Sequence, residues 1–174
     1  MDSRILTRRR FSLTLTSLLS GLGLSTSACE SSRVNGPGGD EISRTEESIH
    51  QEVTLKASRK RVYEAITEAD QFRKVTGVES TKISRELGGA FTLFGGAIEG
   101  RHVELVPAAR IVQAWRASAW ENGKYSIARF ELKDEGTGTR IVFEHTGFPK
   151  GQAEHLASGW KEHYWETLTR YFGA

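Results

Sequence analysis

The chain has 174 residues, with 24 Lys and Arg against 22 Asp and Glu. Residues 1–29 carry four basic groups and one acidic group, so residues 30–174 hold 20 basic and 21 acidic groups and are electrically balanced. A nucleic-acid-binding domain needs a basic surface, and a single Cys supplies neither a disulfide framework nor a multi-cysteine zinc site. We therefore expect no nucleic-acid partner, no metal and no cofactor.

Residues 1–29 have the pattern of an export signal. Arg8 and Arg9 lie in a short basic segment that precedes a mildly apolar stretch ending in small residues, and this order resembles a twin-arginine signal peptide. Ser, Thr and Gly dilute the leucines of that stretch, which suits a signal better than a membrane-spanning helix. An ordinary N-terminal helix is the alternative, but no polar face of helical period accompanies the leucines.

Cys29 follows Ser27 and Ala28, so it is a candidate for lipidation at a lipoprotein processing site. Cleavage near Ala28 that leaves a free thiol is the alternative. We expect export across the bacterial inner membrane to a periplasmic or membrane-anchored location, with membrane contact only through Cys29. If translation starts further along the chain, the domain is cytoplasmic. Residues 30–47 contain almost no large apolar residue and predict a disordered tether.

A folded domain is predicted over residues 48–174, and its first elements are a strand and two helices. Ile49, Val53 and Leu55 lie among polar residues in a strand-like run. Ser58 stands where the N-cap of a helix belongs, and a second short helical piece over 69–75 ends at Gly77.

Apolar runs separated by glycine-rich turns then predict antiparallel strands. They cover residues 81–87, 90–94, 97–106, 111–116, 125–133 and 139–146. We expect a curved sheet of about six strands.

The last predicted element is one long amphipathic helix over residues 151–171. Its apolar stripe recurs at helical spacing and comprises Leu156, Trp160, Tyr164, Leu168 and Tyr171. A sheet with one apolar face must bury it, and this helix is the only predicted element long enough to cover it. The fold class is therefore α+β, a helix-grip arrangement in which a curved antiparallel sheet wraps around the C-terminal helix and encloses a cavity.

Several segments together carry a family resemblance. They are Phe91-Thr92-Leu93-Phe94-Gly95-Gly96, Arg110-Ile111-Val112-Gln113-Ala114-Trp115-Arg116, His145-Thr146-Gly147-Phe148-Pro149, and Gly159-Trp160 with Tyr164-Trp165. They resemble the family named for the C-terminal domain of the activator of the heat shock protein 90 ATPase, in the START-like (SRPBCC) superfamily. The resemblance extends over residues 49–172 and implies the same helix-grip fold.

The resemblance implies much less about activity. Superfamily members bind lipids, polyketides or hormones in the cavity, some catalyse reactions there, and others act as co-chaperones, so the fold does not choose among these functions. The predicted export argues against a cytosolic chaperone as partner.

Two polar features of the predicted sheet have both a functional and a structural interpretation. Strand alternation places His145 on the concave apolar face, where it could contact a ligand or act as a base, or be satisfied by its neighbours. In 97–106, alternation pairs Glu99 with Arg101 on one face and His102 with Glu104 on the other. Whichever pair faces inward would put charge into the cavity, whereas an outer pair would be solvated.

The leading hypothesis from the sequence is a cavity that binds a small apolar or amphipathic molecule. Its predicted lining is Phe91, Leu93, Trp115, Phe130, Phe143, His145, Trp160 and Tyr164. Large side chains that fill the space completely are the structural alternative. A protein-interaction module that uses the outer sheet surface, and an enzyme on an apolar substrate, are the other functional hypotheses. No catalytic residue is predicted.

Overall fold

The computed structural model describes residues 47–173, so the predicted export signal, the lipidation site and most of the predicted tether lie outside the described residues. The elements in chain order are β1 (Ser48–Leu55), α1 (Arg59–Thr67), α2 (Ala69–Thr76), β2 (Lys82–Ile83), β3 (Ala90–Leu93), η1 (Phe94–Gly96), β4 (Ile98–Val106), β5 (Arg110–Ala117), β6 (Ser126–Glu135), β7 (Gly138–Thr146), α3 (Ala153–Trp160), η2 (Lys161–Trp165) and α4 (Glu166–Phe172).

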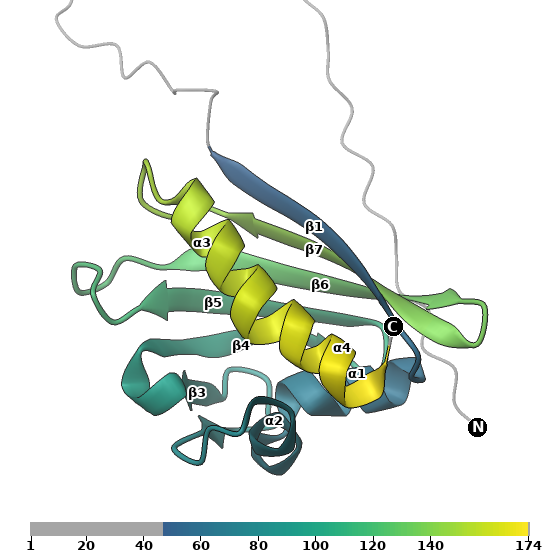
Figure 1. The fold of residues 1–174 in the computed structure, drawn as a ribbon. Coiled ribbons are helices and arrows are strands. Elements are labelled where there is room, and N and C mark those ends of the chain that lie inside the picture. Colours follow the sequence, from purple (N-terminus) through teal and green to yellow (C-terminus); the bar gives the residue numbers. More distant parts are fainter. Residues whose placement is uncertain (1–46, 174) are drawn as a thin grey trace, which may run out of the picture. The chain divides into compact units, whose positions relative to one another are not determined.

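One antiparallel sheet of seven strands has the order β1-β7-β6-β5-β4-β3-β2 (Figure 1). From β2 to β7 every strand pairs with its neighbour in sequence, while β1 pairs with β7, the last strand, from Ser48 opposite Thr146 to Leu55 opposite Thr139. The predicted α+β helix-grip fold is confirmed, with one strand more than the expected number.

The strand β2 is much shorter than the predicted run of 81–87 to which it corresponds. The amide of Gly88 donates to the carbonyl of His102 over 2.8 Å, and the amide of His102 donates to the carbonyl of Gly89 over 3.0 Å. The residues before these glycines form the turn from β2 into β3, in which the amide of Ser84 donates to the carbonyl of Ala90 and that of Gly89 donates to the carbonyl of Glu86, each over 2.9 Å, and Leu87 is 70% exposed.

The two short helices form for the predicted reasons. The Ser58 hydroxyl accepts from the amide of Arg61 at the start of α1, and Gly77 ends α2 in the left-handed conformation at φ 74°. The buried face of α1 comprises Val62, Ala65 and Ile66. α1 contacts β6 and β7, while α2 packs against α4.

The C-terminal helix lies across the concave face of the sheet (Figure 1). It is continuous from α3 through α4, but its central segment η2 is π-helical, and the amide of Glu166 reaches back to the carbonyl of Lys161. A π segment places one extra residue in a turn. The predicted stripe is therefore wrong at Tyr171, which is 41% exposed, whereas Trp165 is buried beside Tyr164.

Close backbone approach on the inner face explains Gly100 in β4. A Cβ atom there would lie 2.1 Å from the carbonyl oxygen of Ala114 and 2.4 Å from the ring of Phe91. Glycine allows the Phe91 ring to lie over the strand, where it is 2% exposed.

The face assignment of β4 needs a correction. The register of β4 against β5 shifts between His102 and Glu104, which is the mark of a β-bulge. His102 therefore faces the core and is 1% exposed, whereas Glu104 faces outward and pairs with Arg110 at 2.8 Å. The prediction that these two residues share a face is wrong, because a bulge breaks the alternation on which it rested.

Candidate functional site

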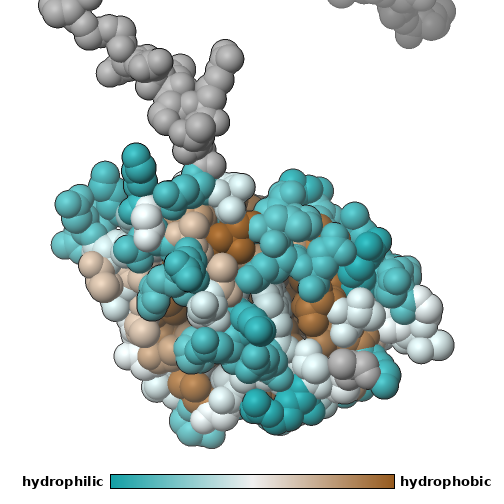
Figure 2. All heavy atoms as spheres, turned by 45° about the horizontal axis from the view of Figure 1, so that its top comes forward, coloured by the Kyte–Doolittle hydropathy of each residue, from teal (hydrophilic) through white to brown (hydrophobic). Residues whose placement is uncertain are grey.

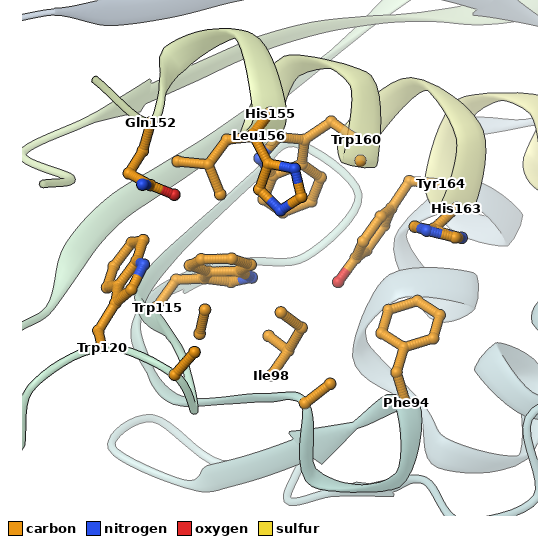
Figure 3. A pocket seen from close by; sticks show the side chains of 14 residues that line it. Phe94, Ile98, Trp115, Trp120, Gln152, His155, Leu156, Trp160, His163 and Tyr164 are labelled. Carbon is orange, nitrogen blue, oxygen red and sulfur yellow. The ribbon is translucent and has the colours of Figure 1, made fainter. Parts of the chain in front are cut away.

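A cavity of about 450 Å³ lies between the first half of the C-terminal helix and the strands β4 and β5 (Figure 3). Its aromatic walls are Phe94, Trp115, Trp120, Trp160 and Tyr164. Its smaller apolar residues are Ala97, Ile98, Ala117, Ala119, Leu156 and Gly159, and its remaining polar ones are Gln152, His155 and His163. This volume and this composition are typical of a site for a small organic molecule.

Three of the eight predicted lining residues, Trp115, Trp160 and Tyr164, line this cavity. The other five are buried in the core beside it and do not line it: Phe91, Leu93, Phe130, Phe143 and His145. Sheet alternation shows which side chains face the helix. It does not show where along the sheet the helix stands away from it.

His145 holds the helix to the sheet in a chain of hydrogen bonds. The indole N–H of Trp160 donates to its Nδ1 over 2.9 Å, and its Nε2 lies 2.7 Å from the Ser126 hydroxyl, which in turn donates to the carbonyl of Trp115 over 2.9 Å. This pattern requires a neutral imidazole with its proton on Nε2. Burial lowers the pKa of His145 from 6.5 to about 3, in agreement with that form.

The bonding of His145 decides between its two interpretations. Both ring nitrogens are occupied by protein groups, and the side chain is fully buried outside the cavity. The hydrogen bonds of His145 thus link the helix to the sheet, as its structural interpretation predicts.

Two polar groups of the cavity wall have no such partners. The Tyr164 hydroxyl and the Trp115 indole nitrogen are buried and make no hydrogen bond to any described residue. Figure 3 shows both atoms directed into the space above Ile98. Burial raises the pKa of the Tyr164 hydroxyl, and the nearby Trp115 N–H offsets this effect in part.

The turn after β5 carries Trp120 to the rim of the cavity. The buried Arg116 pairs with Glu99 and donates to the carbonyl of Trp120 over 2.6 Å. Trp120 then contacts Trp115 edge to face, with ring centroids 5.5 Å apart. Sequence alone gave no signal for Trp120, because its position depends on how this turn folds back over the sheet.

Phe94 closes the opposite end of the cavity from an unusual backbone conformation. Its φ of 52° lies in the left-handed region, which a bulky side chain rarely adopts. Its ring packs against Phe72 and Tyr164, with centroids 5.6 Å away in each case. The prediction of a strand over 90–94 is wrong at this last residue, where the chain turns into η1.

Polar side chains from the helix stand over the cavity. His155 and His163 are exposed residues of one helix side, as their spacing of eight predicts, and Gln152 precedes the helix. Within residues 47–173, no group of three His, Cys, Asp or Glu side chains is placed to hold a metal ion, and no helix is long and apolar enough to cross a membrane.

Comparisons with known proteins agree on one family. The family model described as "Activator of Hsp90 ATPase homolog 1-like protein" matches residues 56–173. The human activator of 90 kDa heat shock protein ATPase homolog 1 is 27% identical over 120 residues, which are 69% of this chain and 35% of the human protein. A Dictyostelium discoideum homologue is 30% identical over 111 residues, or 63% of this chain and 29% of its own length. The chain spans about a third of these relatives.

Solved structures share the fold at low sequence identity. An HSP90 activator from Plasmodium falciparum superposes with a TM-score of 0.68 at 20% identity, covering 71% of this chain and 94% of its own. CalU16 from Micromonospora echinospora gives a TM-score of 0.62 at 22% identity, covering 72% and 76%. These similarities show that the helix-grip arrangement persists while most side chains differ.

Proposed function

The chain belongs to the Activator of Hsp90 ATPase homolog 1-like family, and we propose that its helix-grip domain binds a small apolar or amphipathic molecule between the sheet and the C-terminal helix. The observation that carries the proposal is the cavity of about 450 Å³ with five aromatic walls. A cleft of this size with aromatic walls, between the sheet and the helix, has the dimensions of a small-molecule site.

Gly159 offers a direct test, because it lines the cavity and a Cβ atom added there would meet no atom within 4 Å. Gly159→Leu should fill part of the cavity from the helix side while leaving the backbone helical. Ser158→Leu adds the same side chain to the exposed side of the same helix and is the matched control.

The measurement is native mass spectrometry of the protein purified from the cells that make it, under native and then denaturing conditions. We expect a non-covalent small molecule that is released on denaturation from the wild type and from Ser158→Leu, and is absent from Gly159→Leu. Bare chain mass for all three proteins, together with no binding of apolar probes, would contradict the proposal.

A second candidate function is binding to another protein. It is favoured by the names of the curated relatives, which are activators of a 90 kDa heat shock protein ATPase. The outer sheet surface is the relevant face, and it carries a row of ion pairs that includes Arg110 with Glu131 at 3.4 Å and Arg129 with Glu144 at 3.5 Å. On the face drawn in Figure 2, hydrophobic residues lie in separate small areas between hydrophilic ones.

The ATPase rate of a purified 90 kDa heat shock protein, measured with and without this chain, tests the second candidate. A rate that rises with the concentration of the chain supports it. A rate that stays unchanged at concentrations well above those of the chaperone excludes that activity.

We infer export and lipidation from the sequence of residues 1–29 alone. The twin-arginine pattern at Arg8 and Arg9 predicts delivery across the inner membrane, and Cys29 is the proposed lipid attachment site. In the same mass measurement, lipidation is expected as extra mass that survives denaturation and disappears in Cys29→Ser.

A further inference from the structure

The most informative feature of the cavity is a pair of hydrogen-bond donors that the protein leaves unused. Trp115 is 3% exposed and Tyr164 is 6% exposed, and neither the indole N–H nor the hydroxyl makes a hydrogen bond of normal geometry to a described residue, although the Trp115 N–H lies close enough to the Tyr164 oxygen to lower the pKa of that hydroxyl. A buried donor without a partner destabilises the fold, so such groups are rare unless a ligand or an ordered water completes them.

The protein does supply partners for comparable groups close by. The N–H of Trp160 donates to His145 over 2.9 Å, and the N–H of Trp165 donates to the side-chain oxygen of Gln51 over 2.6 Å. The N–H groups of these two indoles are directed to protein acceptors, whereas Trp115 presents its N–H to the cavity (Figure 3). The unused donors therefore coincide with the space proposed for the ligand.

The charge of the cavity wall limits the kind of acceptor. Lys, Arg, Asp and Glu are all absent from the residues of the described chain that line it. A carboxylate buried beside the two donors would meet no Lys or Arg, and the two lining histidines, His155 and His163, are exposed to water, so burying that charge is far more costly than burying a neutral polar group. The donors thus favour a neutral oxygen over an anionic one.

We propose that the ligand bound under the function proposed above carries a neutral carbonyl oxygen, as in a ketone, aldehyde or ester, which accepts hydrogen bonds from Trp115 Nε1 and the Tyr164 hydroxyl. The apolar remainder of the molecule packs against Ile98, Leu156 and Trp160 (Figure 3). The two donors set the orientation of the molecule, and the aromatic walls provide the contact area.

A matched pair of probes separates this inference from the proposed function on which it rests. 2-Acetylnaphthalene and 2-isopropenylnaphthalene have almost the same shape and differ in replacing C=O by C=CH2. A purely apolar cavity prefers the alkene, because the alkene is the less soluble in water. A cavity with two free donors prefers the ketone.

Binding of both probes is measured by tryptophan fluorescence and by calorimetry. We expect the wild type to bind the ketone about tenfold more tightly than the alkene, the ratio that one to two added hydrogen bonds provide. Tyr164→Phe removes one donor at nearly constant shape, and the ratio should fall to about one or below. Tyr171→Phe removes an exposed hydroxyl and should keep the wild-type ratio.

A vibrational readout identifies the bond itself. The carbonyl stretch of ¹³C-labelled 2-acetylnaphthalene should move to lower wavenumber on binding to the wild type, and should move less in Tyr164→Phe and in Trp115→Phe. If water occupied both donors even with the ketone bound, the carbonyl stretch and the ketone-to-alkene binding ratio would be the same in all these proteins.

The outcomes are distinct. Equal or tighter binding of the alkene by the wild type would overturn the carbonyl site and leave the apolar cavity intact. Absence of binding by both probes would count against the proposed function as well. A ketone preference that survives in Tyr164→Phe would overturn the role of that hydroxyl.

Discussion

At the scale of single residues, the cavity and the core beside it use the same chemistry in opposite ways. Both ring nitrogens of His145 are hydrogen-bonded to protein groups, and one of these bonds links Trp160 to the sheet. Trp115, whose ring contacts His145, and Tyr164, whose ring contacts Trp160, instead present donors to the cavity. The sequence predicted that all four face inward, but the hydrogen-bond partners depend on which strands and turns meet, which a pattern of alternation does not contain.

The pKa of His145 leads to a prediction about stability. The imidazole has a pKa of about 3 in the folded chain and near 6.5 when unfolded, so between these pH values only the unfolded chain binds the proton. The free energy of unfolding should have its full value above about pH 6.5. Below that pH it should fall by roughly 1.4 kcal/mol for each pH unit. Urea unfolding at several pH values measures this slope.

His145→Gln keeps groups that can accept from Trp160 and donate to Ser126 but does not titrate, so it should lower the slope below pH 6. His102, whose pKa burial also lowers, retains its share of the slope. His50→Gln changes an exposed side chain and serves as the control. Identical slopes in the wild type and His145→Gln would show that His145 is not the titrating group.

At the scale of elements, the π segment η2 decides what the C-terminal helix presents to the sheet. It allows Tyr164 and Trp165 to be buried together, and Trp165 stacks on Trp160 at a centroid distance of 5.9 Å with an interplanar angle of 20°. Spacing alone predicted a regular α-helix, because the intervals of four residues before and after this segment fit one. The place of the extra residue in this turn depends on how the large rings pack, and the spacing of apolar residues does not show that.

Removing one residue from the helix should therefore have an effect that depends on place. Deleting Glu162 from η2 converts the π turn into an α turn and keeps both flanks in register. Deleting Ser158 from α3 rotates everything after it by about 100°, which moves Trp160 and Tyr164 away from the core.

We expect the Glu162 deletion to fold with a loss on the order of 2 kcal/mol, and the Ser158 deletion to lose at least twice as much or to remain unfolded. Circular dichroism during urea unfolding gives both values. Equal losses of stability in the two deletion variants would mean that η2 does not contain one inserted residue.

At the scale of the whole molecule, every buried core residue of the described range 47–173 lies between Ile49 and Leu168. A chain that begins at Ile42 should consequently have the same free energy of unfolding as the full chain, within about 0.5 kcal/mol, as expected for changes remote from any buried contact. Urea unfolding of both chains gives the comparison. A loss of more than about 1 kcal/mol on truncation would show that the segment before Ile42 adds to the stability of the domain.

Most of the architecture could be predicted from the sequence, because each element depends on local signals. The cap at Ser58 and the stop at Gly77 both act within a few residues, as do the glycine-rich turns between the strands. The site could be predicted less well from the sequence. Trp120 reaches the cavity through a folded-back turn, and Phe94 reaches it from a left-handed backbone conformation. His102 faces inward because of a bulge. Each of these is a departure from periodicity.

The pairing of β1 with β7 has a consequence for how the domain is made. Strands β2 to β7 can form as successive hairpins, but β1 leaves the ribosome first and its only partner in the sheet is synthesised last. Until β7 emerges, Ile49 and Leu55 have no sheet to join. Closure of this single long loop carries the largest entropic cost of the topology, so the pairing of β1 with β7 sets the pace of folding.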